Sequence, residues 1–310
     1  MMRDQQDQQQ PAGIVGESAF DVIPEVAVAA GGVDEVKDEK EGEGGDGDGN
    51  QIVAAAEGDA FSLAYSVPVS SYTLDELASL EKVYYGLYED YSLQFGQKTS
   101  EHNRDRLGLT TVTLAYAEVS FDIILDQYNI LYQNGFSKAF GGKFYCIGAG
   151  MGKSTMAQLL LHDYDSVKGI EILGDLCAIC DEVRKKFNEI KSDNCSDRKV
   201  ECSFQYLCAD ALSIDWSDAD VAYVAATMFD AAIMKQITFA ASKVKTGSFI
   251  ICVSKELQSP LFDLISTKEI EASFGFTNIY IHRRNEEEHP TYLDDVEYLD
   301  RLGVFKKGIR

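Results

Sequence analysis

Two hydrophobic periodicities alternate along the central half of the chain. Short and nearly continuous apolar runs, typical of strands buried on both faces of a sheet, are separated by segments with helical spacing. The predicted strands cover residues 144–147, 167–173, 200–210, 221–227 and 248–254. A run with helical spacing, residues 229–242, separates the last two strands. This alternation predicts an α/β fold in which helices cover an open and mostly parallel sheet.

Upstream of the sheet, the pattern predicts a helical cap. Its apolar positions recur at helical spacing, at Leu74, Leu77, Leu80, Val83 and Leu87. Ser70, Ser71 and Thr73 are the candidate N-cap residues. The same stretch holds Tyr84, Tyr85, Tyr88 and Tyr91. We expect these tyrosines to pack with their hydroxyls at the surface, although some could instead wall a substrate entrance. Residues 96–108 are polar and predict a mobile loop, which carries a solvated His102.

The first 60 residues differ in composition from the rest. They contain 15 acidic residues against 3 basic ones, and so contribute −12 of the net charge of −23. Such a segment cannot bury enough apolar surface to offset its chain entropy, so we expect it to be disordered. An acidic interaction tail for a basic partner such as a histone is the alternative. The remaining 250 residues carry −11 and no dense basic patch, which disfavours direct nucleic-acid binding.

The seven cysteines predict reduced thiols. Their number is odd, and most lie in predicted strands or helices. The pair Cys177-x-x-Cys180 has no second pair at ligand spacing, so core packing is favoured over a zinc or redox site and no metal is expected. The first residues lack the apolar core of a secretory signal, and no run approaches the ~20 apolar residues that span a bilayer. We therefore expect an intracellular protein, in the nucleus or the cytoplasm, without a membrane partner.

The segment KFYCIGAGMGKST, residues 143–155, predicts a binding site for a nucleotide-like ligand. An apolar strand opens into Gly148, Gly150 and Gly152, and a helix follows, so that the backbone and the unpaired N–H groups of the helix start can approach a ligand. A phosphate-binding P-loop would need glycine where Ile147 stands. A dinucleotide fingerprint would need Gly-x-Gly-x-x-Gly, and the spacing here is Gly-x-Gly-x-Gly.

Two acidic residues follow the glycines at the ends of predicted strands. Glu171 lies about 20 residues past the glycines, where a carboxylate can accept both hydroxyls of an adenosine ribose. Asp210 ends the next predicted strand and could accept from the amino group of adenine. The alternative is that both are ordinary solvated acids in loops, but their distance from the glycine turn favours a ligand-binding role.

These motifs resemble those of class I S-adenosylmethionine-dependent methyltransferases. Within that class, residues 113–131 (TLAYAEVSFDIILDQYNIL) resemble the Tyr-Gly-Glu-x-Ser-Phe-Asp loop and helix of the disruptor-of-telomeric-silencing (Dot-like) histone lysine methyltransferases, with Ala117 in place of glycine. The resemblance implies a Rossmann-like, seven-stranded and mostly parallel sheet, S-adenosyl-L-methionine as cofactor and a protein lysine as acceptor. It implies cofactor binding by Glu118, and a catalytic acceptor channel lined by Tyr116 and Phe229.

The chain departs from that pattern at several positions. Cys146 replaces the acid that ends the first strand, and Ala211 replaces an aromatic residue behind Asp210. The loop after the fourth strand reads Ala225-Ala226-Thr227-Met228-Phe229 and keeps only the final aromatic residue. Tyr280 is a loose candidate for a late channel tyrosine. These changes leave a small metabolite or another protein side chain open as acceptor, and also a non-catalytic module that binds the cofactor.

Four regions are expected along the chain. They are a disordered acidic tail (1–60), a helical cap with a loop that covers the cofactor (61–135), the S-adenosylmethionine-binding domain (136–285) and a peripheral C-terminal tail (286–310). Methyl transfer is an in-line displacement that depends mainly on alignment and on exclusion of water, so no catalytic base is assigned.

Overall fold

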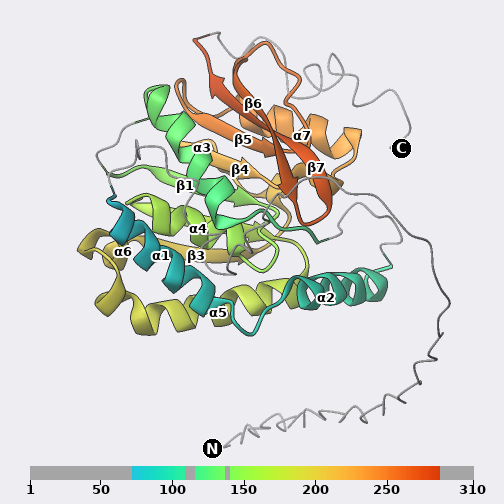
Figure 1. The fold of residues 1–310 in the computed structure, drawn as a ribbon. Helices are drawn as coiled ribbons and strands as arrows, with labels where there is room; N and C mark the ends of the chain where they lie inside the picture. Colours follow the sequence, from blue (N-terminus) through green and yellow to red (C-terminus); the bar gives the residue numbers. More distant parts are fainter. Residues whose placement is uncertain (1–71, 109–115, 137–139, 287–310) are drawn as a thin grey trace, which may run out of the picture. The chain divides into compact units, whose positions relative to one another are not determined.

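The computed structural model describes residues 72–108, 116–136 and 140–286, which form a seven-stranded sheet with helices on both faces (Figure 1). The strand order is β3-β2-β1-β4-β5-β7-β6. The strands are β1 (Lys143–Ile147), β2 (Ser166–Glu171), β3 (Ser203–Cys208), β4 (Val221–Val224), β5 (Phe249–Val253), β6 (Phe262–Ala272) and β7 (Gly275–Arg284). The first five are parallel, and β7 runs antiparallel to both β5 and β6. This confirms the predicted Rossmann-like methyltransferase sheet.

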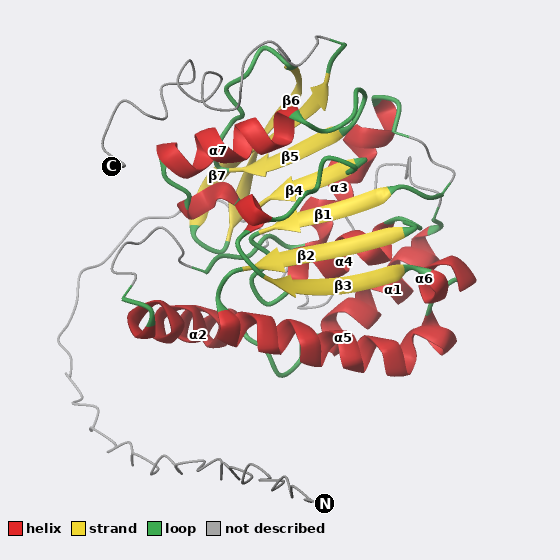
Figure 2. Ribbon diagram, turned by 180° about the vertical axis from the view of Figure 1, so that it is seen from behind, coloured by secondary structure: helices red, strands yellow, loops and turns green. Residues whose placement is uncertain are grey.

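Helices cover the two faces unequally. They are α1 (Leu74–Leu87), α2 (Leu93–Arg106), α3 (Phe121–Gln133), α4 (Lys153–Leu161), α5 (Gly174–Asn194), α6 (Asp197–Glu201) and α7 (Ala231–Ser242). Two short 3-10 helices, η2 (Ala211–Ser213) and η3 (Ala226–Met228), follow β3 and β4. Residues of α1, α3, α4 and α5 share one apolar core with the sheet, while α7 packs on the other face (Figure 2).

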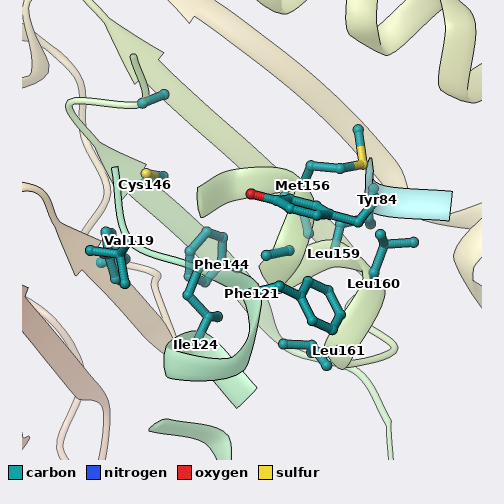
Figure 3. Close-up of a cluster of buried hydrophobic side chains, with 14 of the residues drawn as sticks. Tyr84, Val119, Phe121, Ile124, Phe144, Cys146, Met156, Leu159, Leu160 and Leu161 are labelled. Atoms are coloured by element: carbon teal, nitrogen blue, oxygen red, sulfur yellow. The ribbon is translucent and has the colours of Figure 1, made fainter. Parts of the chain in front are cut away.

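Alternate side chains of β1 point to opposite faces of the sheet, so this strand contributes to both apolar cores. Phe144 and Cys146 point into the core under α1, α3 and α4, where Figure 3 shows them beside Phe121 of α3 and Met156 of α4. Tyr145 faces the opposite side, toward α7. Successive side chains of a strand point to opposite faces, so a strand in the middle of the sheet reads as a continuous apolar run.

The helix α1 begins where the sequence predicts. Thr73 and Glu76 form a capping box: the Thr73 backbone N–H donates to Glu76 Oε2 (2.7 Å), and Thr73 Oγ1 accepts from the Glu76 N–H (3.3 Å). Of the four tyrosines, only Tyr85 is exposed, and Tyr91 donates its hydroxyl to Glu182 Oε2 (2.6 Å). The expected surface position of the hydroxyl is wrong for Tyr88, whose hydroxyl is buried. None of the four lines the cavity at the carboxyl ends of the parallel strands, so the structure does not support a role at a substrate entrance there.

The predicted loop over residues 96–108 is wrong, because most of it belongs to α2. Ser92 caps this helix by accepting from the Phe95 N–H (3.2 Å). The buried face of α2 consists of Gly96, Ser100 and Asn103, and the Asn103 side chain accepts from the Asp175 N–H (3.1 Å). Helical spacing is present, but it is carried by small and polar residues, so no hydrophobic periodicity reveals it. His102 is exposed on this helix.

The strand boundaries differ most from the sequence prediction at the start of the third strand and at the end of the fourth. The third strand begins at Ser203 rather than at Val200, because residues 197–201 form α6, which Ser196 caps. The fourth strand ends at Val224, and η3 follows it directly. Residues 1–71, 109–115, 137–139 and 287–310 lie outside the described part of the chain, and with them the predicted tails and part of the covering loop. None of the described helices is long and apolar enough to cross a membrane.

Candidate functional site

The glycine loop connects β1 to α4 in a left-handed backbone path. Gly148, Gly150 and Gly152 have φ values of 78°, 59° and 85°, which side-chain-bearing residues rarely adopt. The N–H groups of Gly148 and Ala149 both donate to the Ile170 carbonyl, at 3.0 and 2.9 Å, and this fixes the loop on β2. No side chain caps the start of α4, and the N–H groups of a first helical turn have no intrahelical acceptor. The first turn of α4, rather than the loop itself, therefore presents N–H donors at this end of the sheet.

The three glycines are required for different reasons. A Cβ atom on Gly150 would lie 2.6 Å from the Tyr116 ring, and one on Gly152 would lie 2.3 Å from Tyr206 Oη. A Cβ atom on Gly148 would meet only ordinary contacts, the nearest being Ala225 Cβ at 3.5 Å. Tyr206 also donates its hydroxyl to the Gly152 carbonyl (3.1 Å). Gly152 thus allows helix and strand to approach closely and lies outside the cavity wall, whereas Gly148 and Gly150 lie in it.

A cavity of about 390 Å³ opens at the carboxyl ends of the parallel strands. It lies at the point where the chain order reverses, since β1 pairs with β2 on one side and with β4 on the other. In open α/β sheets this switch point is where ligands bind, and the volume is within the range of small-molecule sites. Seven of the eight residues predicted from the sequence line it, namely Tyr116, Glu118, Gly148, Gly150, Glu171, Asp210 and Phe229.

The Glu171 carboxylate is buried and largely occupied by backbone donors. Its Oε2 accepts from the Gly150 N–H (2.7 Å), and its Oε1 accepts from the N–H groups of Ile172 and Leu173 (both 2.9 Å). Burial raises the pKa of this carboxyl, and the three N–H donors oppose that shift. A carboxylate offers about four acceptor positions. About one therefore remains for a ligand, so Glu171 has room for one ribose hydroxyl rather than the two expected.

Asp210 lies two residues beyond β3 and is exposed. Its Oδ1 accepts from the Leu212 N–H (2.9 Å), which caps η2 at its start. The other carboxylate oxygen is available to a donor from a ligand. The capping bond also explains why an acid can stand here for a structural reason, which the sequence alone could not separate from a binding role.

Tyr116 and Glu118 form a charged network with a residue that the sequence interpretation missed. The Tyr116 hydroxyl donates to Glu118 Oε1 (2.8 Å), and Lys153 Nζ lies 2.8 Å from Oε1 and 2.9 Å from Oε2 of the same carboxylate. The Lys153 and Glu118 side chains are only 14% and 17% exposed. Burial, and then the Glu118 charge, raise the pKa of Tyr116 well above its usual value, so the phenol stays neutral. In the sequence, Lys153 differs from the other lysines only by following the glycine loop, as the lysine of a P-loop does.

The tip of the β6–β7 hairpin forms the far rim of the cavity, which was also not predicted. Phe274 lines the cavity. Next to it, Ser273 Oγ accepts from the Glu118 N–H (2.8 Å), and the Ser273 N–H donates to the Glu118 carbonyl (3.2 Å). The two segments are 155 residues apart in sequence. Sequence pattern could not pair them, because the contact depends on the sheet closing between them.

The loop after β4 forms the remaining wall. Phe229 follows η3, and its carbonyl accepts from Lys255 Nζ. Thr227 Oγ1 accepts from Ser254 Oγ (3.1 Å), and Ser254 Oγ accepts in turn from Thr277 Oγ1 (2.8 Å), so β7 supports this loop. Tyr280, the loose candidate for a channel tyrosine, packs against the core under α7 and lies outside the cavity wall. This wall of the cavity thus carries a single aromatic residue from the loop.

The cysteines near the site are packed in the core. Cys180 Sγ donates to the Gly150 carbonyl (3.1 Å), and Cys177 Sγ donates to the Glu171 carbonyl (3.3 Å). Cys146 is fully buried, and burial raises its pKa to about 12, so it carries no charge. Within the described residues, no group of three or more His, Cys, Asp or Glu side chains could hold a metal ion.

No family model matches the sequence, and no curated protein matches it. Solved structures match at low similarity. An RNA methyltransferase from Salinibacter ruber in complex with S-adenosyl-L-homocysteine is 18% identical, over 56% of this chain and 95% of that chain, with a TM-score of 0.38. A putative methyltransferase from Escherichia coli is 11% identical over 56% and 90% (TM-score 0.42), and a putative RNA methyltransferase from Pyrococcus horikoshii is 15% identical over 61% and 99% (TM-score 0.40).

At this similarity the comparisons transfer no residue role and no acceptor to this chain. They also give no support to the finer, Dot-like resemblance. The Rossmann-like methyltransferase fold is defined by the strand order and by the position of the cavity.

Proposed function

We propose that the protein is an S-adenosylmethionine-dependent methyltransferase. The observation that carries this proposal is the cavity at the switch point, which brings Gly148 and Gly150, Glu171 and Asp210 together at the ends of successive strands. The N–H groups at the uncapped start of α4, directly after the glycine loop, would face the amino-acid part of the cofactor. Glu171 would accept from the ribose, and Asp210 from the adenine amino group. The residues present suit the cofactor, because the wall combines carboxylates, one ammonium group and apolar surface.

The bound cofactor would supply a methyl group on a sulfonium, which an acceptor attacks in line. The residues of the chain then have three tasks, which are to hold the two partners in line, to exclude water and to leave the acceptor lone pair free. The neutral Tyr116 phenol, Phe229 and Met228 form a mostly apolar wall suited to these tasks. If the acceptor is an amine, an apolar wall lowers its pKa by penalising the charged form.

The acceptor we favour is a protein lysine of the histone type, as the Dot-like motif around Tyr116 suggests. Charge agrees with this choice, because Asp210 and Asp230 are exposed residues of the cavity wall and would repel a phosphate backbone. The alternative acceptors are RNA, another protein side chain and a small metabolite; two of the three structures named above are described as RNA methyltransferases. A module that binds the cofactor without catalysis is the remaining alternative. Each is an outcome of the experiment below.

Two measurements test the proposal in sequence. Isothermal titration with S-adenosyl-L-homocysteine should give a dissociation constant that is micromolar or tighter, and no heat at millimolar ligand would refute the cofactor assignment. Transfer of a radiolabelled methyl group is then measured with core histones, nucleosomes, total RNA and a fractionated cell lysate. Label on histone supports the lysine acceptor. Label only on RNA or elsewhere overturns that acceptor, and cofactor binding without any label indicates the non-catalytic module.

A further inference from the structure

The ion pair between Lys153 and Glu118 lies in the cavity wall beside the glycine loop. Lys153 is the first residue of α4, and Glu118 belongs to the segment before α3. Both side chains are mostly buried, yet both line the cavity. Among the residues that the structure places in this wall, Lys153 is the only cation. A buried ion pair is costly to desolvate and is weak evidence for stability, so its position invites a role in binding.

We propose that Lys153 and Glu118 form a receptor for the zwitterionic end of the cofactor, with Lys153 pairing with its carboxylate and Glu118 with its ammonium group. This inference rests on the proposed function. In the free protein the two residues neutralise each other. Binding exchanges one internal ion pair for two pairs with the ligand, so that no charge remains unpaired in the cavity. Such a receptor is specific for a ligand that carries a carboxylate and an ammonium group close together.

The structure explains why these two residues, rather than Cys146, take this role. Cys146 ends the first strand as a buried neutral thiol and cannot pair with an ammonium group. Glu171 is closest to the glycine loop among the other acids, but three backbone N–H groups already occupy it. The Glu118 carboxylate instead accepts from two side chains, the Tyr116 hydroxyl and the Lys153 ammonium group. Replacing that cation by the ligand ammonium group leaves the other bond unchanged.

Glu118 is held in place independently of Lys153. The Tyr116 hydroxyl orients its carboxylate, and Ser273 makes two hydrogen bonds with its backbone. The Tyr116 ring in turn lies between Gly96 and Gly150, where any added Cβ atom would come within 2.6 Å of it. Lys153 can therefore move toward a ligand carboxylate while Glu118 stays fixed. The uncapped start of α4 places a partial positive charge at the same point, which favours that carboxylate further.

The same geometry separates this ligand from a nucleoside triphosphate. A lysine after a glycine loop is also how a P-loop binds phosphates. Here the Glu118 carboxylate lies 2.8 Å from the ammonium group of that lysine and would face the phosphates at close range. Two like charges in a partly buried site repel each other strongly. ATP is therefore expected to bind poorly.

The test combines two variants with three ligands, each measured by isothermal titration. The ligands are S-adenosyl-L-homocysteine, its analogue without the carboxylate and its analogue without the ammonium group. Lys153→Met should weaken binding of the complete ligand by roughly 10-fold to 100-fold, and change binding of the analogue without carboxylate less than about twofold. Glu118→Gln should show the same loss for the complete ligand and little loss for the analogue without the ammonium group. Lys185→Met, an exposed lysine on α5, is the control and should change nothing.

The outcomes separate the inference from the proposed function. Equal weakening of all three ligands by Lys153→Met would mean a structural role, and an unchanged affinity would mean no role; either result overturns the receptor. Lys153→Arg keeps the charge and should keep the dependence on the ligand carboxylate, which covers the case that the Met variant does not fold. Tighter binding of ATP than of S-adenosyl-L-homocysteine by the wild-type protein would also overturn it. Failure of the wild-type protein to bind S-adenosyl-L-homocysteine refutes the proposed function itself.

Discussion

The proposed function divides the cavity into a cofactor side and an acceptor side, and these two regions are built in different ways. Most of the cofactor side comes from one continuous stretch, residues 143–171, in which a strand, a glycine turn, a helix and a second strand follow one another. The acceptor side is assembled from three distant segments, which carry Tyr116, Phe229 and Phe274. The first side depends on backbone geometry, and the second depends on which side chains the closed sheet brings together. The two sides should therefore respond differently to substitution.

The largest effect is expected from Gly152→Ala, which attacks the backbone geometry of the cofactor side. The new Cβ atom would lie 2.3 Å from Tyr206 Oη at a residue with φ of 85°. We expect the free energy of unfolding to fall by about 2–5 kcal/mol, from left-handed strain and overpacking together. Chemical denaturation measures this loss.

Gly174→Ala is the matched control for that substitution. Gly174 begins α5, and a Cβ atom there would have no neighbour within 4 Å. Alanine is the better helix former, so the control should be neutral or slightly stabilising. In the Gly152→Ala variant, the second substitution Tyr206→Phe removes the hydroxyl that the new Cβ atom meets. It should recover part of the lost free energy of unfolding. Equal stability of the two alanine variants would show that the packing of Gly152 against Tyr206 is not required.

The next effect is expected from Glu171→Ala, which removes both a ligand contact and the anchor of the glycine loop. Three backbone N–H groups lose their acceptor. We expect the affinity for S-adenosyl-L-homocysteine to fall by at least roughly tenfold, and the free energy of unfolding to fall by about 1–3 kcal/mol. Titration and denaturation of the same preparation measure the two losses. Glu189→Ala, at an exposed position of α5, is the control, and an affinity within twofold of wild type would contradict the assignment of Glu171.

The smallest effect on cofactor binding is expected from Phe229→Ala, which changes the acceptor side alone. We expect the affinity for S-adenosyl-L-homocysteine to stay within about threefold of wild type, while methyl transfer slows by roughly tenfold or more because the acceptor is aligned less well. The rate is measured with the acceptor that takes up label in the transfer assay described above. Phe276→Ala, on an aromatic residue of β7 that is 74% exposed, should change neither quantity. An equal loss of affinity and rate for Phe229→Ala would remove the distinction between the two sides.

The same division explains how far the sequence could predict the molecule. The glycine loop, Glu171 and Asp210 were found because parallel strands place their ends at one edge of the sheet, so spacing along the chain is enough. The sequence predicts a loop in place of α2 because the buried face of this helix is made of Gly96, Ser100 and Asn103. Small and polar residues form this buried face, so apolar residues do not recur along α2 at helical spacing.

The charged network was missed for a different reason. The residues around Tyr116 resemble a family motif, whereas Lys153 follows a glycine loop that lacks the first glycine of a P-loop, so no motif in the sequence assigns it a role. Its partner is 35 residues upstream, and the Ser273 contact is 155 residues downstream of Glu118. Such pairings depend on tertiary closure and have no period that a single sequence displays.

The hydrogen bonds between Glu118 and Ser273 have a consequence for the order in which the protein becomes complete. During synthesis the glycine loop and its two strands leave the ribosome well before the β6–β7 hairpin exists. The segment carrying Glu118 is made earlier still, yet Ser273, to which its backbone bonds, is made more than a hundred residues later. A chain that stops short of Ser273 therefore lacks the two hydrogen bonds that hold the Glu118 backbone at the cavity rim, even if its parallel strands have already formed.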